Sequence, residues 1–248
     1  MSKHFELLQQ LEKEQTRASA AASEPVVLPP DESMISIGQG QLADKETLRL
    51  VQQIFLMQTQ APPRMVVFAG IDHGNGCSRI CATVAETLAK NAEGRVCIVE
   101  ANFRSPGLSG FFGVPNHFGL TEALLRDAPI DTYTTSTGLE NLWLLSAGTV
   151  AADSPALLSS DHFKFRLDQI RKEFDFVIID APPLTPYSDA AVLGQLSDGV
   201  VLVIEADATR REAASAVADS LRSVNVPILA AVLNKRTYPI PEKVYSRL

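Results

Sequence analysis

Short apolar runs, separated by segments long enough for a helix, constrain the fold of this chain more than any other feature. An unbroken apolar run of this length is typical of a strand that is buried on both faces, and strands that alternate with helices form a parallel sheet. We therefore expect an α/β fold, namely a doubly wound, mostly parallel sheet flanked by helices. The expected strands are residues 65–69, 95–100, 142–146, 176–180, 199–206 and 228–233. A helix over residues 45–58, with Asp44 as its N-cap, is expected before the first strand.

The chain has 248 residues, of which 46% are hydrophobic, and it can bury one sizeable core. Residues 1–17 carry apolar side chains three positions apart, which indicates a short amphipathic helix. Residues 18–36 have the Ala, Ser and Pro content of an extended linker. We place the boundary near residue 40, so that 1–40 form a helix and linker and 41–248 form the domain.

Charge and cysteine content restrict the classes of function. The formal net charge of −7 and the lack of a basic run disfavour sequence-independent binding of nucleic acid, which needs clustered Lys and Arg. The three cysteines are odd in number, which indicates reduced thiols in a cytoplasm rather than a disulfide framework. We expect neither a signal peptide nor a membrane-spanning helix.

The strand at residues 65–69 continues into a turn that carries Gly74 and Gly76, and then into a helix. A strand, a glycine-bearing turn and a helix N-terminus in this order bind phosphate on backbone amides. A phosphate loop of the G-x-x-x-x-G-K-[ST] type also needs a lysine after its last glycine, and that position holds Cys77. The hydroxyl that serves magnesium is present as Ser78. The turn is therefore predicted to be a phosphate-binding loop (P-loop) that lacks its main positive charge.

Cys77 lies one helical turn before Cys81, a spacing that would supply half of a metal site. None of the four histidines has a matching spacing, and packing is the role that the sequence favours for both thiols. A thiol at a helix N-terminus can also have a lowered pKa, so a reactive Cys77 is a further alternative.

Polar side chains follow other expected strands at their carboxyl ends, where ligands sit in open parallel sheets. The strand at residues 95–100 ends in Glu100 and leads into Asn102. Asp180 ends the apolar run of the strand at residues 176–180. A carboxylate in this place is typical of a Walker B strand, where it faces a hydrated magnesium ion. Asn234 follows the last strand and is a candidate for binding a nucleotide base.

Taken together and in this order, the motifs resemble the cytoplasmic domain of bacterial tyrosine kinases (BY-kinases) of the CpsD/CapB type. The segments that carry the resemblance are residues 154–160, 174–183, 198–203 and 232–235. This family is related to MinD and ParA and works in capsule and exopolysaccharide export. The resemblance covers roughly residues 44–248 and implies a P-loop NTPase-like domain that binds ATP and Mg²⁺.

The family's functional groups match this chain unevenly. The family's P-loop lysine falls on Cys77, and one aspartate of its second acidic motif falls on Asn102. The lysine neutralises charge on the transferred phosphoryl group, and the aspartate can accept the tyrosyl proton, so both losses affect catalysis. Arg79 is close enough in sequence to return some positive charge. The resemblance assigns nucleotide binding to Gly74, Asn75, Gly76, Cys77, Ser78, Arg79 and Asn234, catalysis to Glu100, Asn102 and Asp180, and metal ligation to Ser78 and Asp180.

Two further family motifs are only partly present. The Glu-x-x-Arg-x-x-Arg helix motif, through which family members associate, matches at Glu46 and Arg49 but has Gln52 in its last position. The tyrosine-rich tail that the family autophosphorylates is reduced to Tyr238 and Tyr245.

These features predict a degenerate BY-kinase-like protein that binds and turns over ATP weakly or not at all, and that acts as a regulatory or assembly partner in exopolysaccharide and capsule export. The implied partners are a membrane polysaccharide co-polymerase or chain-length regulator, a second copy of the chain and an active kinase paralogue, at the inner face of the cell membrane. Two alternatives stay open. One is an active tyrosine autokinase in which Arg79 or a neighbouring subunit replaces the lysine, and the other is a MinD/ParA-like positioning ATPase.

Overall fold

The computed structural model of the chain describes residues 34–37, 41–57, 61–150 and 154–236. Most of the helix and linker expected over residues 1–40 lies outside these ranges. The two candidate phosphoacceptors, Tyr238 and Tyr245, lie outside them as well.

A single sheet of eight strands, in the order β1-β8-β7-β2-β6-β3-β5-β4, organises the described residues. The strands are β1 (Met34–Ile37), β2 (Met65–Gly70), β3 (Val96–Glu100), β4 (Thr135–Ser136), β5 (Leu142–Leu145), β6 (Phe176–Asp180), β7 (Gly199–Glu205) and β8 (Ile228–Asn234). All neighbouring strands are parallel except β4 and β5. The predicted doubly wound, mostly parallel sheet is therefore confirmed.

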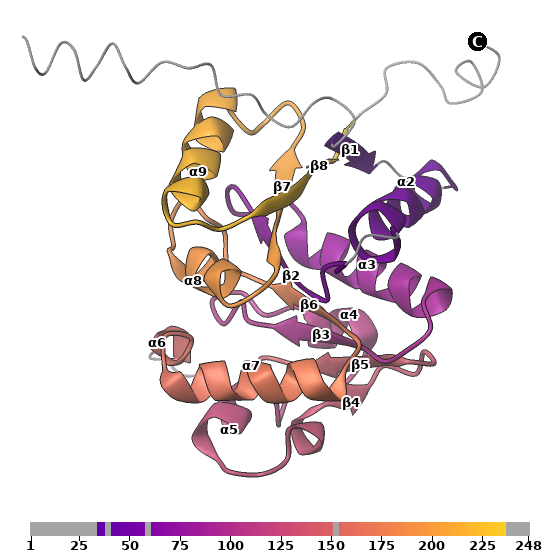
Figure 1. Cartoon of the computed structure of the whole chain (residues 1–248), viewed down its shortest axis with the longest axis vertical. Helices are drawn as coiled ribbons and strands as arrows, with labels where there is room; N and C mark the ends of the chain where they lie inside the picture. The colour runs from indigo at the N-terminus through magenta and orange to yellow at the C-terminus, as the bar shows by residue number, and fades with distance from the viewer. Residues whose placement is uncertain (1–33, 38–40, 58–60, 151–153, 237–248) are drawn as a thin grey trace, which may run out of the picture. The chain divides into compact units, whose positions relative to one another are not determined.

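Helices cover both faces of this sheet, as Figure 1 shows. The helices are α2 (Gln41–Val51), α3 (Cys77–Asn91), α4 (Leu108–Phe112), α5 (Leu120–Leu125), α6 (Ser154–Leu157), α7 (Asp161–Glu173), α8 (Asp189–Gln195) and α9 (Arg211–Ser223), with a π-helical turn η2 (Gln52–Leu56) and a 3-10 turn η3 (Ile130–Tyr133). One apolar core contains residues of α5, α7, α8 and α9, and the other contains residues of α2, α3 and α4. The two cores lie on opposite faces of the central strands.

The apolar runs of the sequence explain this layering. Every residue of β2 and of β3 is buried, because both faces of these strands are covered by helices. Helix α3 turns Ile80, Val84 and Leu88 toward the sheet at the spacing of an amphipathic helix. No helix in the described ranges combines the length and the apolarity needed to cross a membrane.

The structure departs from the sequence-based expectation near the start of the domain. Strand β1 pairs with β8 inside the segment 1–40 that was expected to be helix and linker, so the sheet begins before residue 41. Helix α2 begins at Gln41, and Asp44 lies in its first turn rather than at its N-cap. The short strand β4, which was not expected at all, forms the opposite edge of the sheet. Both unexpected strands are edge strands of at most four residues, too short for a clear sequence pattern.

Candidate functional site

The P-loop lies between β2 and α3. Gly74 and Gly76 both have a φ of +80°, a left-handed conformation that explains why glycine is needed at each position. The first amides of α3 have no intrahelical acceptor, so they form an anion-binding end of the helix. The loop borders a pocket of about 220 Å³. This P-loop pocket is lined by Gly70, Asp72, His73, Gly74, Asn75, Gly76, Cys77, Ser78, Arg79, Asn102, Ser105, Ala181 and Pro183.

The structure brings most of the expected site residues together around this pocket. Residues 74–79 and Asn102 line it, although they come from different strand ends. Glu100, Asp180 and Asn234 lie at the same edge of the sheet but are not part of the lining. Each of the three makes contacts behind the pocket wall.

Asn234 supports the P-loop from behind. Its Nδ2 donates a hydrogen bond of 2.7 Å to the carbonyl oxygen of Asn75. A Cβ atom on Gly76 would lie only 2.5 Å from the same Nδ2, so the side chain of Asn234 fills the space that glycine leaves open. Asn234 therefore positions the loop, while its expected contact with a base stays a prediction.

Asn75 closes the turn from within. The residue is 3% exposed, and its Oδ1 accepts a hydrogen bond of 2.6 Å from the backbone N–H of Asp72. That amide is therefore already bonded inside the loop and is not free for a phosphate oxygen. The amides at the N-terminus of α3 remain as the phosphate-binding groups.

Two thiols and a carboxylate lie together beneath the loop. One donor atom from each of Cys77, Cys81 and Asp180 lies within 4.8 Å of the other two. The Sγ of Cys81 donates to Oδ1 of Asp180 over 3.6 Å. Burial raises the pKa of Cys81 well above its usual value. The hydrogen bond with Cys81 lowers the pKa of Cys77, but burial and the carboxylate of Asp180 raise it further, so the structure does not support a reactive thiolate at Cys77.

Asp180 is fully buried at the end of β6. Burial raises its pKa to about 7, with a further increase from the charge of Glu100, while a hydrogen bond with Ser78 acts in the opposite direction. Its Oδ2 finds no hydrogen-bond partner among the described residues, and neither does the buried Oδ1 of Asn102. Unpaired buried oxygens beside the Ser78 hydroxyl fit a hydrated magnesium ion, which prefers oxygen ligands.

Glu100 has a structural role in this arrangement. Its Oε1 accepts hydrogen bonds from the backbone N–H groups of Gly107 at 2.5 Å and Leu108 at 2.6 Å. Its Oε2 accepts from the N–H of Ala147 at 3.1 Å. Both carboxylate oxygens thus hold the start of α4 and the segment after β5, and these contacts do not support the catalytic role expected for Glu100.

A group of side chains beside the P-loop pocket had not been expected from the sequence. The guanidinium of Arg104 lies 3.8 Å from the ring centroid of Tyr187 and 3.1 Å from the carboxylate of Asp189. The same tyrosine ring makes an edge contact with His73 of the P-loop, with ring centroids 5.7 Å apart. In the sequence, Arg104 follows shortly after the strand that ends at Glu100 and Asp189 begins α8, but nothing in the sequence placed Tyr187 between them.

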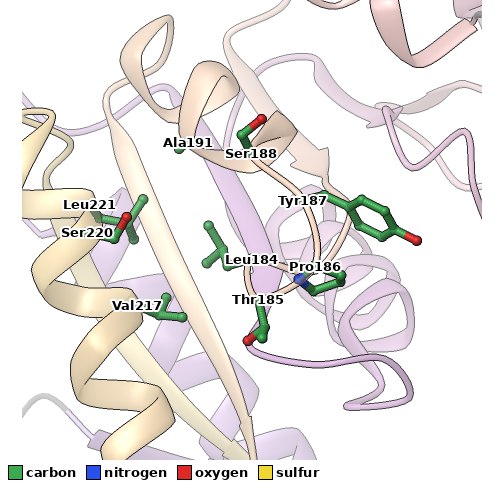
Figure 2. A pocket seen from close by; sticks show the side chains of 9 residues that line it. All are labelled: Leu184, Thr185, Pro186, Tyr187, Ser188, Ala191, Val217, Ser220 and Leu221. Atoms are coloured by element: carbon green, nitrogen blue, oxygen red, sulfur yellow. The ribbon is translucent and has the colours of Figure 1, made fainter.

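A second hollow, of about 300 Å³, lies between α9 and the segment that leads into α8 (Figure 2). Leu184, Val217 and Leu221 give it an apolar wall, and the ring of Tyr187 points away from it. The ionisable groups of the P-loop pocket do not line this hollow, so the chemistry of the site belongs to the P-loop pocket.

The two residues of the expected association motif lie on α2. Arg49 is exposed and Glu46 is half-buried. A role in contacts between subunits stays a prediction for both.

The parallel sheet, the strand, turn and helix around Gly76, and Asp180 at the end of a neighbouring strand define a P-loop NTPase-like domain. No protein-family profile matches the chain. The tyrosine-protein kinase YwqD of Bacillus subtilis is 30% identical over 161 residues, which cover 65% of this chain and 68% of that protein. The putative tyrosine-protein kinase CapB of Staphylococcus aureus is 29% identical and covers 65% of this chain and 70% of that protein. The chain belongs to the family of bacterial tyrosine-protein kinases.

Solved structures share the fold. The chimerical protein CapA2B2 has a TM-score of 0.74 at 24% identity, with 81% of this chain and 87% of that chain covered. The kinase domain of the Escherichia coli tyrosine kinase ETK has a TM-score of 0.73 at 23% identity, with coverage of 81% and 79%. The septum site-determining protein MinD of Pyrococcus horikoshii, complexed with Mg-ADP, has a TM-score of 0.61 at 20% identity, with coverage of 74% and 76%.

Proposed function

We propose that this protein is a degenerate BY-kinase that binds and turns over ATP weakly or not at all, and that serves as a regulatory or assembly partner in bacterial exopolysaccharide and capsule export. The observation that carries the proposal is the thiol of Cys77 where a phosphate loop has its lysine. Arg79 is the only lysine or arginine among the described residues that line the P-loop pocket, and its side chain is exposed.

The remaining groups favour weak ground-state binding over catalysis. The free amides and the dipole at the N-terminus of α3 attract a phosphate, and Ser78 and Asp180 would hold a magnesium ion that neutralises phosphate charge. Asn102 stands where the family has an aspartate, and a carboxamide cannot accept a proton from a tyrosyl group. Removing one preorganised charge-stabilising group costs roughly a hundred- to a thousand-fold in rate, so two losses leave little phosphoryl transfer.

The partner role follows from the family. Such a protein would act at the inner face of the cell membrane through a membrane co-polymerase or chain-length regulator, and would associate with copies of itself or with an active kinase paralogue. Glu46 and Arg49 on α2 are the residues that we assign to contacts between subunits.

A single assay tests the loss of kinase activity. The full chain is incubated with Mg-ATP, and both phosphate on Tyr238, Tyr245 and Tyr187 and the release of inorganic phosphate are measured. We expect neither above background. Labelling or hydrolysis at about 1 s⁻¹ or faster, in the range of active kinases, would contradict the proposal.

The second candidate is an active tyrosine autokinase in which Arg79 replaces the lysine. The position of Arg79 on the wall of the P-loop pocket is the observation in its favour. In that case the assay above gives labelled tyrosine, and Arg79→Ala removes the labelling while Cys77→Ala does not.

A further inference from the structure

The cluster of Cys77, Cys81 and Asp180 has the spacing of a metal site. The Sγ of Cys81 and Oδ1 of Asp180 are 3.6 Å apart, and the three donor atoms all lie within 4.8 Å of one another. A tetrahedral zinc ion, with Zn–S distances of about 2.3 Å and Zn–O distances of about 2.1 Å, separates a sulfur and an oxygen ligand by roughly 3.6 Å. The sulfur and oxygen are therefore already placed as two ligands of one ion.

A second observation, which also bears on the magnesium site, points to a cation at Asp180. Oδ2 of Asp180 is buried and has no hydrogen-bond partner in the described part of the chain. The residue itself is 0% exposed. A buried carboxylate oxygen without a partner is costly, and a cation in contact with the carboxylate would remove that cost.

The donor chemistry selects the kind of ion. Thiolate ligands favour zinc and other thiophilic metals, whereas magnesium and calcium favour oxygen ligands alone. We propose that Cys77, Cys81 and Asp180 form a binding site for a thiophilic divalent cation, with Zn²⁺ as the ion that fits their donor set and spacing. This site differs in donor chemistry from the magnesium site that Ser78 and Asp180 would complete with a nucleotide, and the two sites share Asp180.

The burial of the three residues determines from which side an ion could reach the cluster. Cys81 and Asp180 are fully buried, whereas Cys77 is half-buried and lines the P-loop pocket. An ion held by these three residues would therefore be reached from the P-loop pocket through Cys77. Three protein ligands with one open position are typical of zinc sites that accept water or another small ligand.

The two thiols are placed together by the fold. Cys81 lies one turn after Cys77 on α3, so both side chains are on the helix face toward β6. The substitution of the family lysine by Cys77 is thus what completes a pair with Cys81. The sequence alone had favoured packing for both thiols, because the third ligand is an aspartate from a strand that comes 99 residues after Cys81.

Metal titration of the full chain tests the proposal. The reduced, metal-free protein is titrated with Zn²⁺ in competition with a chromophoric chelator, without nucleotide, so that the outcome is independent of the proposed function. We expect one equivalent of Zn²⁺ to bind, and excess Mg²⁺ not to displace it. Co²⁺ in place of Zn²⁺ should give a thiolate-to-cobalt charge-transfer band.

Variants identify the ligands. Cys77→Ser and Asp180→Asn should each weaken Zn²⁺ binding at least about tenfold and reduce the cobalt band. Cys97→Ser is the control, because Cys97 is a free, buried thiol that packs in the core on the other face of the sheet from Cys81. It should leave both signals unchanged.

Three results would overturn the proposal. The first is Zn²⁺ binding that is no tighter in the unmodified chain than in the Cys77→Ser variant. The second is equal weakening by Cys97→Ser, and the third is release of the ion by Mg²⁺. Since Cys77 is half-buried, its serine variant is expected to fold, and far-ultraviolet circular dichroism checks this for every variant.

Discussion

The carboxamide of Asn234 donates a hydrogen bond of 2.7 Å to the carbonyl oxygen of Asn75, and so joins the end of β8 to the P-loop across 159 residues of sequence. The shape of the loop is therefore fixed by the sheet as well as by its own glycines. Gly76 allows this contact, because a side chain there would meet the same amide nitrogen.

Alanine substitutions at the two loop glycines separate backbone strain from this contact. Gly74 and Gly76 share a φ of +80°, but a Cβ on Gly74 meets no described heavy atom within 4 Å, whereas one on Gly76 lies 2.5 Å from Nδ2 of Asn234. We expect Gly74→Ala to lower the free energy of unfolding by about 1 kcal/mol through strain alone. Gly76→Ala should cost about 1–2 kcal/mol more, because it also displaces a hydrogen-bonded side chain. Urea denaturation of both variants measures the difference.

A double-mutant cycle shows whether Asn234 causes that difference. Asn234→Ala removes the obstructing side chain, so the added cost of Gly76→Ala should largely disappear in the double variant. Additive costs in the double variant would mean that the side chain of Asn234 does not restrict Gly76.

Replacing Glu100 tests its structural role. Both of its oxygens accept backbone hydrogen bonds, and a glutamine supplies one acceptor in place of two and directs an N–H group at a donor. We expect Glu100→Gln to lower the free energy of unfolding by about 2–4 kcal/mol, because hydrogen bonds to a buried charged group are strong. Glu140→Gln, at an exposed position, is the control and should change stability by less than about 0.5 kcal/mol. Equal effects of the two variants would contradict the structural role.

Asp198 makes the free energy of unfolding depend on pH, with lower stability in acid. Burial alone would raise the pKa of Asp198, but hydrogen bonds from the N–H groups of Met65 and Arg64 and the guanidinium of Arg171 lower it. A lowered pKa in the folded state means that the ionised carboxylate stabilises the fold above the unfolded-state pKa of about 3.9, and that this contribution is lost as the pH falls through the folded-state pKa.

We expect Asp198→Asn to cost about 1 kcal/mol at pH 7, a value limited by the partial exposure of the side chain, and to cost progressively less as the pH falls below about 4. Urea denaturation of both proteins at several pH values measures this. Asp219→Asn, which removes an exposed ion pair with Arg222, is the control and should have little effect at any pH. A cost of Asp198→Asn that does not change with pH would show that the ionised carboxylate is not responsible.

The sequence predicted the central strands and the P-loop because these elements carry their own signals. Unbroken apolar runs specify β2, β3 and β6, and glycine at positions of positive φ specifies the turn. Edge strands β1 and β4 were missed, because they are short and their pairing depends on a neighbouring strand rather than on an internal pattern. The helix and linker were predicted over residues 1–40, of which residues 34–37 form β1, and for the rest of the segment this stays a prediction.

The sequence predicted where the site residues lie in the sheet, but not which groups their side chains contact. The sequence placed Cys77, Asn102 and Asp180 at one edge of the sheet, because the ends of parallel strands meet there. It did not show that Glu100 and Asn234 support the backbone, because their partners are amide and carbonyl groups that only the folded chain brings near. The Cys77, Cys81 and Asp180 cluster was missed because its aspartate comes from a strand 99 residues after Cys81.

The affinity for Mg-ATP tests the central claim, which is that the thiol at position 77 and the amide at position 102 have removed the charge on which nucleotide binding and transfer depend. Isothermal titration compares the unmodified chain with the variant that carries both Cys77→Lys and Asn102→Asp, with Cys97→Ser as a control for the loss of a buried thiol. We predict that the double variant binds Mg-ATP at least about tenfold more tightly, because a cation and an acid return to an amide site that is already formed. Equal affinity in the two proteins, together with loss of binding in Arg79→Ala, would contradict the claim.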